Sequence, residues 1–364
     1  MEKIIDIIKN AKVEWKQLGE ICEIKRGRVI SKQDIEENFG KYPVYSSQTQ
    51  NNGEIGKIST YDFDGDYITW TTDGAHAGTV FFRSGKFSVT NVCGLIKNIN
   101  DNINLKYISY YLEITTKKYV VAGSGNPKLM SNVISKIPIP IPSLKTQEKI
   151  VEILDNFINI EKELEKELEK RKKQYEYYRK KLLTLDEEKI VIKKLSEVLT
   201  IKRGKRITKR DLIENGKYPV VSGGVKFMGY IDKYNRNENT ITIAQYGTAG
   251  YVNIQKEKFW ANDVCFSLFP KEEILNKYLY YFLTNKQNYL YEISNKNAIP
   301  YNISKEKILE IKIPIPDIKV QEEIVNILEQ FEKLINDIEE GLPKEIELRK
   351  KQYEYYRKKI LTFK

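Results

Sequence analysis

Apolar residues recur at intervals of three, four or seven residues, all sums of three and four, through the segment 144–184, which contains neither proline nor glycine. The apolar positions are Ile150, Leu154, Phe157, Leu164, Leu168, Tyr175, Tyr178 and Leu182. Such spacing is typical of a coiled-coil seam, so the segment predicts one long helix that needs a helical partner. About 40 residues at ~1.5 Å each would form a rod of roughly 60 Å. Ser143, just after a proline, can cap this helix.

A second seam of the same kind follows Asp317. Its apolar positions are Ile324, Leu328, Phe331, Ile335, Ile338, Tyr353, Tyr356 and Ile360. Between its two halves the sequence Glu340-Gly-Leu-Pro343 fits an insertion of four residues relative to the first seam. An insertion of this length locally unwinds a supercoil, and a proline inside a helix breaks or kinks it. We therefore expect the second helix to be broken near Pro343.

Two other segments, 1–143 and 186–316, have the mixed pattern of globular domains. Short runs rich in β-branched and aromatic residues alternate with glycine-containing turns, which predicts strands, and 105–112 has helical spacing. Each segment ends in alternating isoleucine and proline, at 137–142 and 311–316. Prolines at this density exclude a helix and a central strand, so we interpret both runs as stiff extended linkers.

The chain is an internal repeat. Residues 171–181 and 349–359 share the sequence Arg-Lys-Lys-Gln-Tyr-Glu-Tyr-Tyr-Arg-Lys-Lys, and Lys-Tyr-Pro-Val occurs at 41–44 and 217–220. The predicted organisation is a first globular domain (1–143), a first spacer helix (144–185), a second globular domain (186–316) and a second spacer helix (317–364). The expected fold class is α+β: two similar α/β domains separated by two long helices that form an antiparallel coiled coil with a pseudo-twofold repeat.

Composition narrows the possible partners and chemistry. The net charge of +11 and the pI of about 9.1 favour a polyanion as partner. Three widely spaced cysteines and a single histidine argue against a disulfide framework or a metal site. The sequence lacks a run of 18 apolar residues, as a membrane span needs, and the apolar core of a signal peptide. It also lacks the P-loop of one class of ATPases and any Pro-Pro pair, which the Asn/Asp-Pro-Pro-aromatic signature of adenine methyltransferases requires. We therefore expect a cytoplasmic, non-catalytic protein with no membrane partner.

The repeated pieces resemble the specificity (S) subunit of type I restriction–modification systems over essentially the full length of the chain. The resemblance is carried by Trp15-Lys-Gln-Leu-Gly-Glu20, Ile24-Lys-Arg-Gly27, both Lys-Tyr-Pro-Val runs, both Ile-Pro-Ile-Pro runs, and the related octapeptides at 147–154 and 321–328. It implies two target-recognition domains, each reading one half of a split, asymmetric site in double-stranded DNA. It also implies helices that set the gap and dock two modification (M) subunits, together with restriction (R) subunits. AdoMet, ATP and Mg²⁺ would then belong to these partners, and this chain would hold no cofactor.

Candidate DNA-contacting residues fall in basic turns and glycine-flanked loops. Lysine and arginine suit phosphates, whereas amide, hydroxyl and carboxylate groups can meet base edges. In the first domain they are Lys25, Arg26, Arg28, Lys32, Gln48, Thr72, Asp73 and His76. In the second they are Lys202, Arg203, Lys205, Arg206, Lys226, Gln245, Tyr246 and Thr248. For any single loop residue, an ordinary turn remains the alternative.

Surfaces that are identical in both halves should face something present twice. Tyr177, Arg179, Tyr355 and Arg357 belong to the identical segments, and they are candidates for docking the M subunits. Symmetric packing of the helices alone is the competing explanation. Two other functions remain open from the sequence: a stand-alone two-headed DNA-binding regulator, and a coiled-coil scaffold without DNA specificity.

Overall fold

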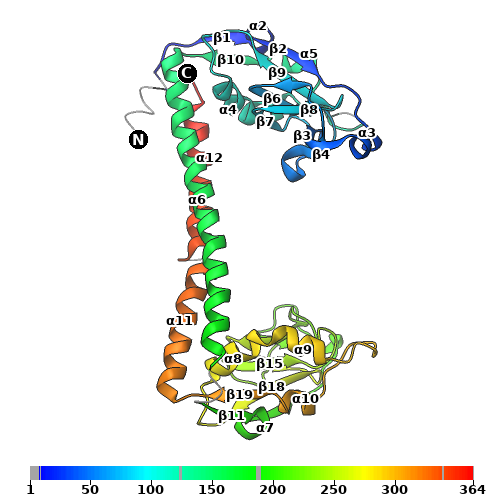
Figure 1. The fold of residues 1–364 in the computed structure, drawn as a ribbon, viewed down its shortest axis with the longest axis vertical. Coiled ribbons are helices and arrows are strands. Elements are labelled where there is room, and N and C mark those ends of the chain that lie inside the picture. The colour runs from blue at the N-terminus through cyan, green and yellow to red at the C-terminus, as the bar shows by residue number, and fades with distance from the viewer. Residues whose placement is uncertain (1–7, 9, 123–124, 186–189, 338–339, 364) are drawn as a thin grey trace. The chain divides into compact units, whose positions relative to one another are not determined.

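The computed structural model describes residues 8, 10–122, 125–185, 190–337 and 340–363 (Figure 1). It divides into two compact units: Met1–Leu164 with Ile346–Lys364, and Glu165–Glu345. The division falls within the long helix α6 (Leu144–Leu183). Each unit therefore contains one globular domain and parts of two long helices. Among the described residues, no helix is long and apolar enough to cross a membrane.

The first domain contains two four-stranded sheets of order β2-β9-β6-β7 and β4-β3-β8-β5. The strands of the first sheet are β2 (Cys22–Arg26), β6 (Tyr67–Thr71), β7 (Val80–Arg83) and β9 (Cys93–Asn98). Those of the second are β3 (Phe39–Tyr45), β4 (Glu54–Ile58), β5 (Phe63–Asp64) and β8 (Lys86–Val89). The helices are α2 (Leu18–Ile21), α3 (Lys32–Glu37), η1 (Gln50–Gly53), α4 (Leu105–Thr115), η2 (Thr116–Tyr119) and α5 (Ser131–Ile134). Helix α4 buries Tyr107, Ile108 and Leu112 in one core with Ile68 and Trp70 of β6.

The second domain repeats this plan, with sheets of order β12-β18-β15-β16 and β14-β13-β17. The strands of the first sheet are β12 (Leu199–Arg203), β15 (Thr240–Ala244), β16 (Val252–Gln255) and β18 (Cys265–Pro270). Those of the second are β13 (Tyr218–Val221), β14 (Gly229–Ile231) and β17 (Trp260–Ala261). The helices are α7 (Leu195–Val198), η3 (Lys209–Asp211), α8 (Asn276–Asn285), α9 (Gln287–Ile293) and α10 (Lys305–Leu309). Tyr278 and Phe282 of α8 pack with Ile241 and Ile243 of β15, as α4 packs on β6.

The Ile-Pro runs are strands and not the unpaired linkers expected from the sequence. β10 (Pro138–Ile141) pairs antiparallel with β1 (Glu14–Gln17), and β19 (Lys312–Ile315) pairs with β11 (Val191–Lys194). Each pair is a separate two-stranded sheet. Proline is tolerated here because an edge strand needs backbone donors on one side only. The strands that enter and leave each domain therefore lie side by side.

The long helices pack against each other within each unit. In the first unit, Phe157 of α6 stacks on Tyr356 of α12 (Leu342–Ile360) with ring centroids 5.5 Å apart. Further along α6, Glu161 forms an ion pair of 3.4 Å with Lys350, which precedes Tyr356 on α12. The two helices are therefore antiparallel, as predicted.

The second unit contains the same helix contact. Phe331 of α11 (Ile318–Asn336) stacks on Tyr178 of α6 with ring centroids 5.7 Å apart. In addition, the Tyr175 hydroxyl donates to Glu332 at 2.9 Å. Each unit thus contains the same kind of helix–helix contact, with the roles of the two repeats exchanged. This is what the predicted pseudo-twofold repeat implies.

The second long segment consists of two helices. α11 ends at Asn336 and α12 begins at Leu342, so Pro343 lies in the first turn of α12. Proline is favourable at that position because its missing N–H would have no partner within the helix. Ile338, one of the predicted seam residues, lies outside the described residues.

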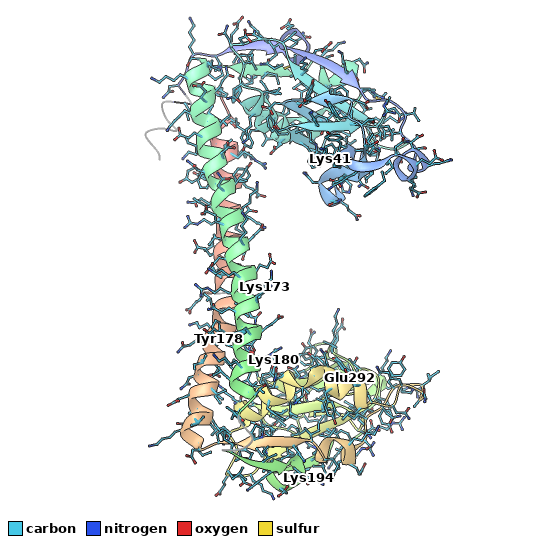
Figure 2. The ribbon with its side chains drawn as sticks, viewed as in Figure 1. Lys41, Lys173, Tyr178, Lys180, Lys194 and Glu292 are labelled. Atoms are coloured by element: carbon cyan, nitrogen blue, oxygen red, sulfur yellow. The ribbon has the colours of Figure 1, made fainter. Side chains whose placement is uncertain are left out.

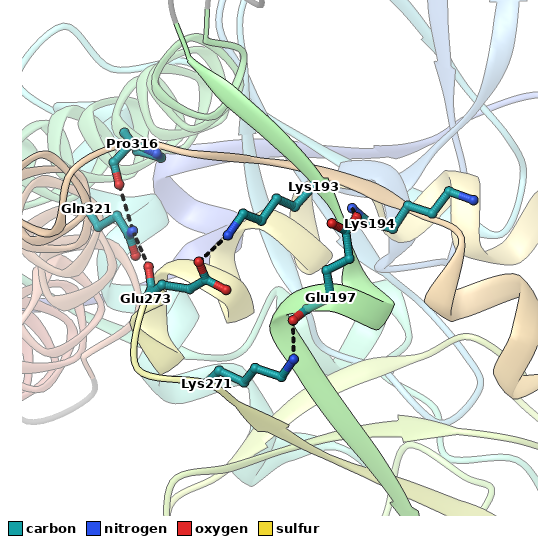
Figure 3. Close-up of polar contacts among 7 residues, drawn as sticks. All are labelled: Lys193, Lys194, Glu197, Lys271, Glu273, Pro316 and Gln321. Atoms are coloured by element: carbon teal, nitrogen blue, oxygen red, sulfur yellow. Dashed lines mark hydrogen bonds and ion pairs between the residues drawn. The ribbon is translucent and has the colours of Figure 1, made fainter.

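A buried glutamine joins each domain to its long helix. In the second unit, Gln321 Nε2 donates to the carbonyls of Pro316 (2.9 Å) and Glu273 (3.1 Å), as Figure 3 shows. Its Oε1 accepts from Leu275 N at 2.8 Å. In the first unit, Gln147 makes the same three kinds of bond. Its partners are Pro142 O at 2.9 Å, Asn102 O at 3.1 Å and Asn104 N at 2.8 Å. Both glutamines have no exposed surface, which explains why the repeated octapeptide begins with this residue.

Candidate nucleic-acid interface

A basic turn follows strand β2 in the first domain and strand β12 in the second. It contains Gly27 after β2 and Gly204 after β12, and neither position has room for a side chain. A Cβ on Gly27 would lie 1.9 Å from Val89 O, and one on Gly204 would lie 2.1 Å from Ala261 O. This close packing of the backbone leaves the neighbouring lysines and arginines exposed at the surface.

In the first domain, much of this positive charge is engaged by the protein itself. Lys25 pairs with Glu23 at 2.7 Å, and Arg28 pairs with Asp62 at 3.0 Å. Arg26 donates to Ser131 Oγ at 3.4 Å, while Lys32 is exposed in the first turn of α3. The basic turn of the first domain is therefore only weakly positive.

The basic turn of the second domain is more open. Lys202, Lys205 and Arg206 are exposed, and within the described ranges no carboxylate lies at ion-pair distance from them. Arg203 Nη2 donates to Gln245 Oε1 at 2.6 Å, which brings together two residues predicted from separate segments. This contact connects the basic turn to the loop that follows β15.

Three loops meet beside that basic turn in the second domain. Gln245, Tyr246 and Thr248 lie half-buried on the loop after β15, and exposed Lys226 lies on the loop after β13. Thr248 N donates to Gly223 O at 2.9 Å, which joins these two loops. Gly247 N, in a residue with φ of +78°, donates to Tyr301 O at 3.1 Å. The third loop, which contains Tyr301, was not predicted from the sequence because no motif marks it.

The first domain gathers the corresponding three loops. Asp73, after β6, is bridged to Lys128 in the third loop, where Gly74 N also donates to Pro127 O at 3.0 Å. His76 is exposed on the same turn. Gln48, on the loop after β3, uses its amide nitrogen to donate to Glu54 O at 2.7 Å. Its remaining amide oxygen is the group that could meet a base edge.

Thr72 does not fit the predicted role of a base contact. Its side chain is only 2% exposed, and its Oγ1 donates to Val92 O at 2.8 Å. Its backbone N–H donates to Ser47 Oγ at 3.1 Å. Thr72 therefore joins loops to one another, and a small polar residue beside glycine is compatible with either role in a sequence.

Arg83 supports a loop of the candidate interface, and the sequence analysis did not single it out. It is 4% exposed, its guanidinium lies 3.6 Å from the Tyr45 ring centroid, and it donates to Asn52 O at 2.7 Å. Asn51 and Asn52 have φ of 48° and 54°, a left-handed conformation that non-glycine residues seldom adopt. Arg83 thus holds the tip of the loop after β3.

The docking candidates separate into exposed tyrosines and engaged arginines. Tyr177 and Tyr355 are each 59% exposed, and each meets the next tyrosine edge-on at 5.3 and 5.2 Å. Arg179 lies over Tyr175 at 5.3 Å. Arg357 lies over Tyr353 at 4.9 Å and pairs with Glu113 at 2.9 Å. The two tyrosines therefore remain exposed, whereas both arginines pack within their own units.

The family model for the type I restriction modification DNA specificity domain matches residues 10–170 and again residues 187–348. This chain belongs to that family. A Mycoplasma pneumoniae protein that bears the name of a type I specificity subunit is 34% identical over 357 residues, 95% of this chain and 97% of the relative.

Two solved structures share the fold of this specificity subunit. The crystal structure of the S subunit from the M. genitalium type I system covers 98% of this chain and 97% of its own, at 19% identity and a TM-score of 0.61. A chain from a study of complex assembly and conformational transition in the type I system covers 96% and 97%, at 15% identity and a TM-score of 0.62. The family assignment and the two-domain, two-helix fold predicted from the repeat are thereby confirmed.

The Glu113–Arg357 pair of the specificity subunit predicts a pH effect on stability. Burial raises the pKa of Glu113 to about 7, against the opposing effect of Arg357. The unfolded chain would release this proton near pH 4.5, so Glu113 favours the folded state below that pH. This contribution is lost as the pH rises towards 7. Relative to Glu113→Gln, we expect the wild type to lose roughly 1–3 kcal/mol of unfolding free energy between pH 5 and pH 8.

Urea unfolding at a series of pH values measures this difference. Glu354→Gln, at an exposed position of the same helix α12 that carries Arg357, is the matched control. Parallel pH profiles for wild type and Glu113→Gln would contradict the prediction.

Proposed function

We propose that this chain is the non-catalytic DNA-specificity subunit of a type I restriction–modification complex and that each domain reads one half of a bipartite, asymmetric site. One observation carries the proposal: both domains build a basic turn beside three joined loops, but with different side chains on those loops. A common scaffold with different contact groups suits two unlike half-sites, because backbone contacts position a protein while base-edge contacts specify sequence.

The docking of two M subunits is the second part of the proposal. Tyr177 and Tyr355 are equally exposed and have matching tyrosine neighbours, which supports two equivalent sites for one kind of partner. AdoMet would be bound by the M subunits, and ATP and Mg²⁺ by the R subunits. The complex would act on double-stranded DNA in the cytoplasm.

Exchanging a whole domain tests whether each domain recognises its half-site independently of the other. Residues 1–143 are replaced by the corresponding domain of another specificity subunit, and the chimera is co-expressed with its M subunit. We expect the methylated sequence to change in one half-site and to stay the same in the other. Sequencing of methylated adenines in the host genome measures both halves.

Two results would contradict the proposal. A change in both halves would show that the domains do not read independently. Purification of the wild type without any M subunit, while it still binds a specific sequence, would favour a stand-alone regulator. The reciprocal exchange of residues 186–316 is the matched control, because it should alter only the other half-site.

A further inference from the structure

A cluster of two tyrosines and two lysines lies at the surface of the first domain. Tyr42 of β3 and Tyr61, which follows β4, meet edge to face with ring centroids 5.0 Å apart and an interplanar angle of 63°. Lys41 Nζ lies 5.2 Å from the Tyr42 ring, and Lys86 Nζ lies 4.5 Å from the Tyr61 ring. Figure 2 labels Lys41, which lies on β3. We name these four residues the first cation–tyrosine cluster.

The second domain contains the same arrangement. Tyr218 of β13 and Tyr234, after β14, meet at 5.0 Å and 61°. Lys217 Nζ lies 5.4 Å from the Tyr218 ring, and Lys258 Nζ lies 4.9 Å from the Tyr234 ring. These four residues form the second cation–tyrosine cluster, which lies on or close to the equivalent strands β13, β14 and β17.

The match is informative because the surrounding loops have diverged. Residues 47–58 and 223–231 bear little resemblance, yet four side chains from three separate segments keep the same geometry on either side of them. Only the Lys-Tyr-Pro-Val motif, which supplies one lysine and one tyrosine to each cluster, was visible as a repeat. A function shared by both domains accounts for this retention.

Packing alone does not explain the clusters. Tyr61 is 41% exposed and Tyr234 is 44% exposed; Lys41, Lys86 and Lys217 are exposed, and Lys258 is half-buried. A pair of tyrosines can hold two loops together without an ammonium group over either ring. A cation–π contact orients the ammonium group but does not neutralise its charge, so the lysines remain available to an anion.

The charge around the clusters favours an anionic partner. In the first cluster, the hydrogen bond to the Tyr61 hydroxyl raises the pKa of Lys86, and Asp64 at 3.8 Å offsets part of its charge, while Lys41 adds a second cation. Beside the second cluster, Lys233 lies 5.2 Å from the Trp260 ring and adds a third cation. Lysine ammonium and tyrosine hydroxyl groups are both common donors to DNA phosphates.

We infer that the two cation–tyrosine clusters bind the phosphate backbone of the DNA, one cluster at each half-site. This inference rests on the proposed function. Two half-sites of different sequence have the sugar–phosphate backbone in common, so a contact retained in both diverged domains is expected to address the backbone. The clusters would set the position of each domain on the duplex, and the loops would read the bases.

The test measures how the affinity of the assembled S–M complex for its target depends on salt. Each lost phosphate contact lowers the magnitude of the slope of log K against log salt by about 0.9. We expect Lys41→Gln with Lys86→Gln to lower it by about 1.8 and to weaken binding by roughly tenfold or more near physiological salt, without a change in the preferred sequence. Lys217→Gln with Lys258→Gln should do the same.

The controls separate the possible explanations. Lys312→Gln with Lys319→Gln removes the same charge from exposed positions outside the clusters and should leave the slope nearly unchanged. Tyr61→Phe and Tyr234→Phe keep the ring packing and should weaken binding to a smaller extent than the lysine pairs. The amount of M subunit that co-purifies without DNA is measured for every variant.

Two outcomes would overturn the inference. If the wild-type complex binds its site and the cluster variants keep its salt slope, the clusters do not touch phosphates. If the variants lose the M subunit before DNA is added, the clusters dock protein and not DNA. A wild-type complex without sequence preference would instead show that the proposed function fails, and this result is visible before any variant is made.

Discussion

Replacing Lys202, Arg203, Lys205 and Arg206 together with glutamine is expected to weaken DNA binding by about two to three orders of magnitude near physiological salt. These four residues form the open basic turn of the second domain, where, within the part of the chain that the structure describes, only the Arg203 side chain donates a hydrogen bond, to Gln245. Each phosphate contact releases condensed counterions, so four losses should lower the magnitude of the salt slope by about 3.6. Fluorescence anisotropy with the assembled complex at several salt concentrations measures both quantities.

The first domain provides the matched comparison. Replacement of Lys25, Arg26, Arg28 and Lys32 with glutamine should have a clearly smaller effect, because Lys25 and Arg28 already pair with Glu23 and Asp62. Equal losses for the two variants would show that these internal ion pairs do not reduce the contribution of the first turn.

Arg203→Ala alone should also shift base preference in the second half-site, because it releases the side chain of Gln245.

Gln321→Leu is expected to lower the free energy of unfolding by about 3–5 kcal/mol. The substitution removes three hydrogen bonds and leaves the carbonyls of Pro316 and Glu273 and the N–H of Leu275 without this partner in a buried joint. Buried polar groups without partners carry the full cost of desolvation. Chemical denaturation followed by circular dichroism measures the loss.

Two substitutions show whether the joint causes the loss. Gln147→Leu should have an effect of the same size, because Gln147 makes the equivalent three bonds in the first unit. Gln330→Leu lies on the same helix as Gln321 but at an exposed position, so it should change stability by less than about 0.5 kcal/mol. A large loss in the Gln330 variant would mean that leucine disturbs the helix itself and that the glutamine joint is not the cause.

The long helices and the repeat could be predicted because their information is local or duplicated. The seam positions follow a helical period that is visible within one segment, and Phe157 and Phe331 take equivalent places because the repeats match. The Ile-Pro strands were harder to predict, since a proline-rich run does not reveal its pairing partner. Trp15 faces Pro140 from more than a hundred residues away.

The candidate interface was predicted only in part, because its contacts join distant segments. The basic turns were visible as local clusters of charge, but their ion pairs were not, and these reduce the positive charge of the first turn. The structural roles of Thr72, which was a predicted base contact, and of Arg83, which was not predicted, could not be seen in the sequence for the same reason. A threonine in a glycine-rich loop is buried by contacts with Ser47 and Val92, while an arginine within a strand supports a loop tip 31 residues away.

The division of α6 between the units has a consequence for synthesis on the ribosome. The second unit is one continuous stretch of chain, whereas the first also needs residues 346–364. Ile360 and Leu361 are among its most deeply buried side chains, and they pack in the same core as Leu18 and Trp70. The unit that contains the first residues to be translated therefore also needs residues translated near the end of synthesis, and we expect its apolar core to remain accessible to chaperones until those residues are available.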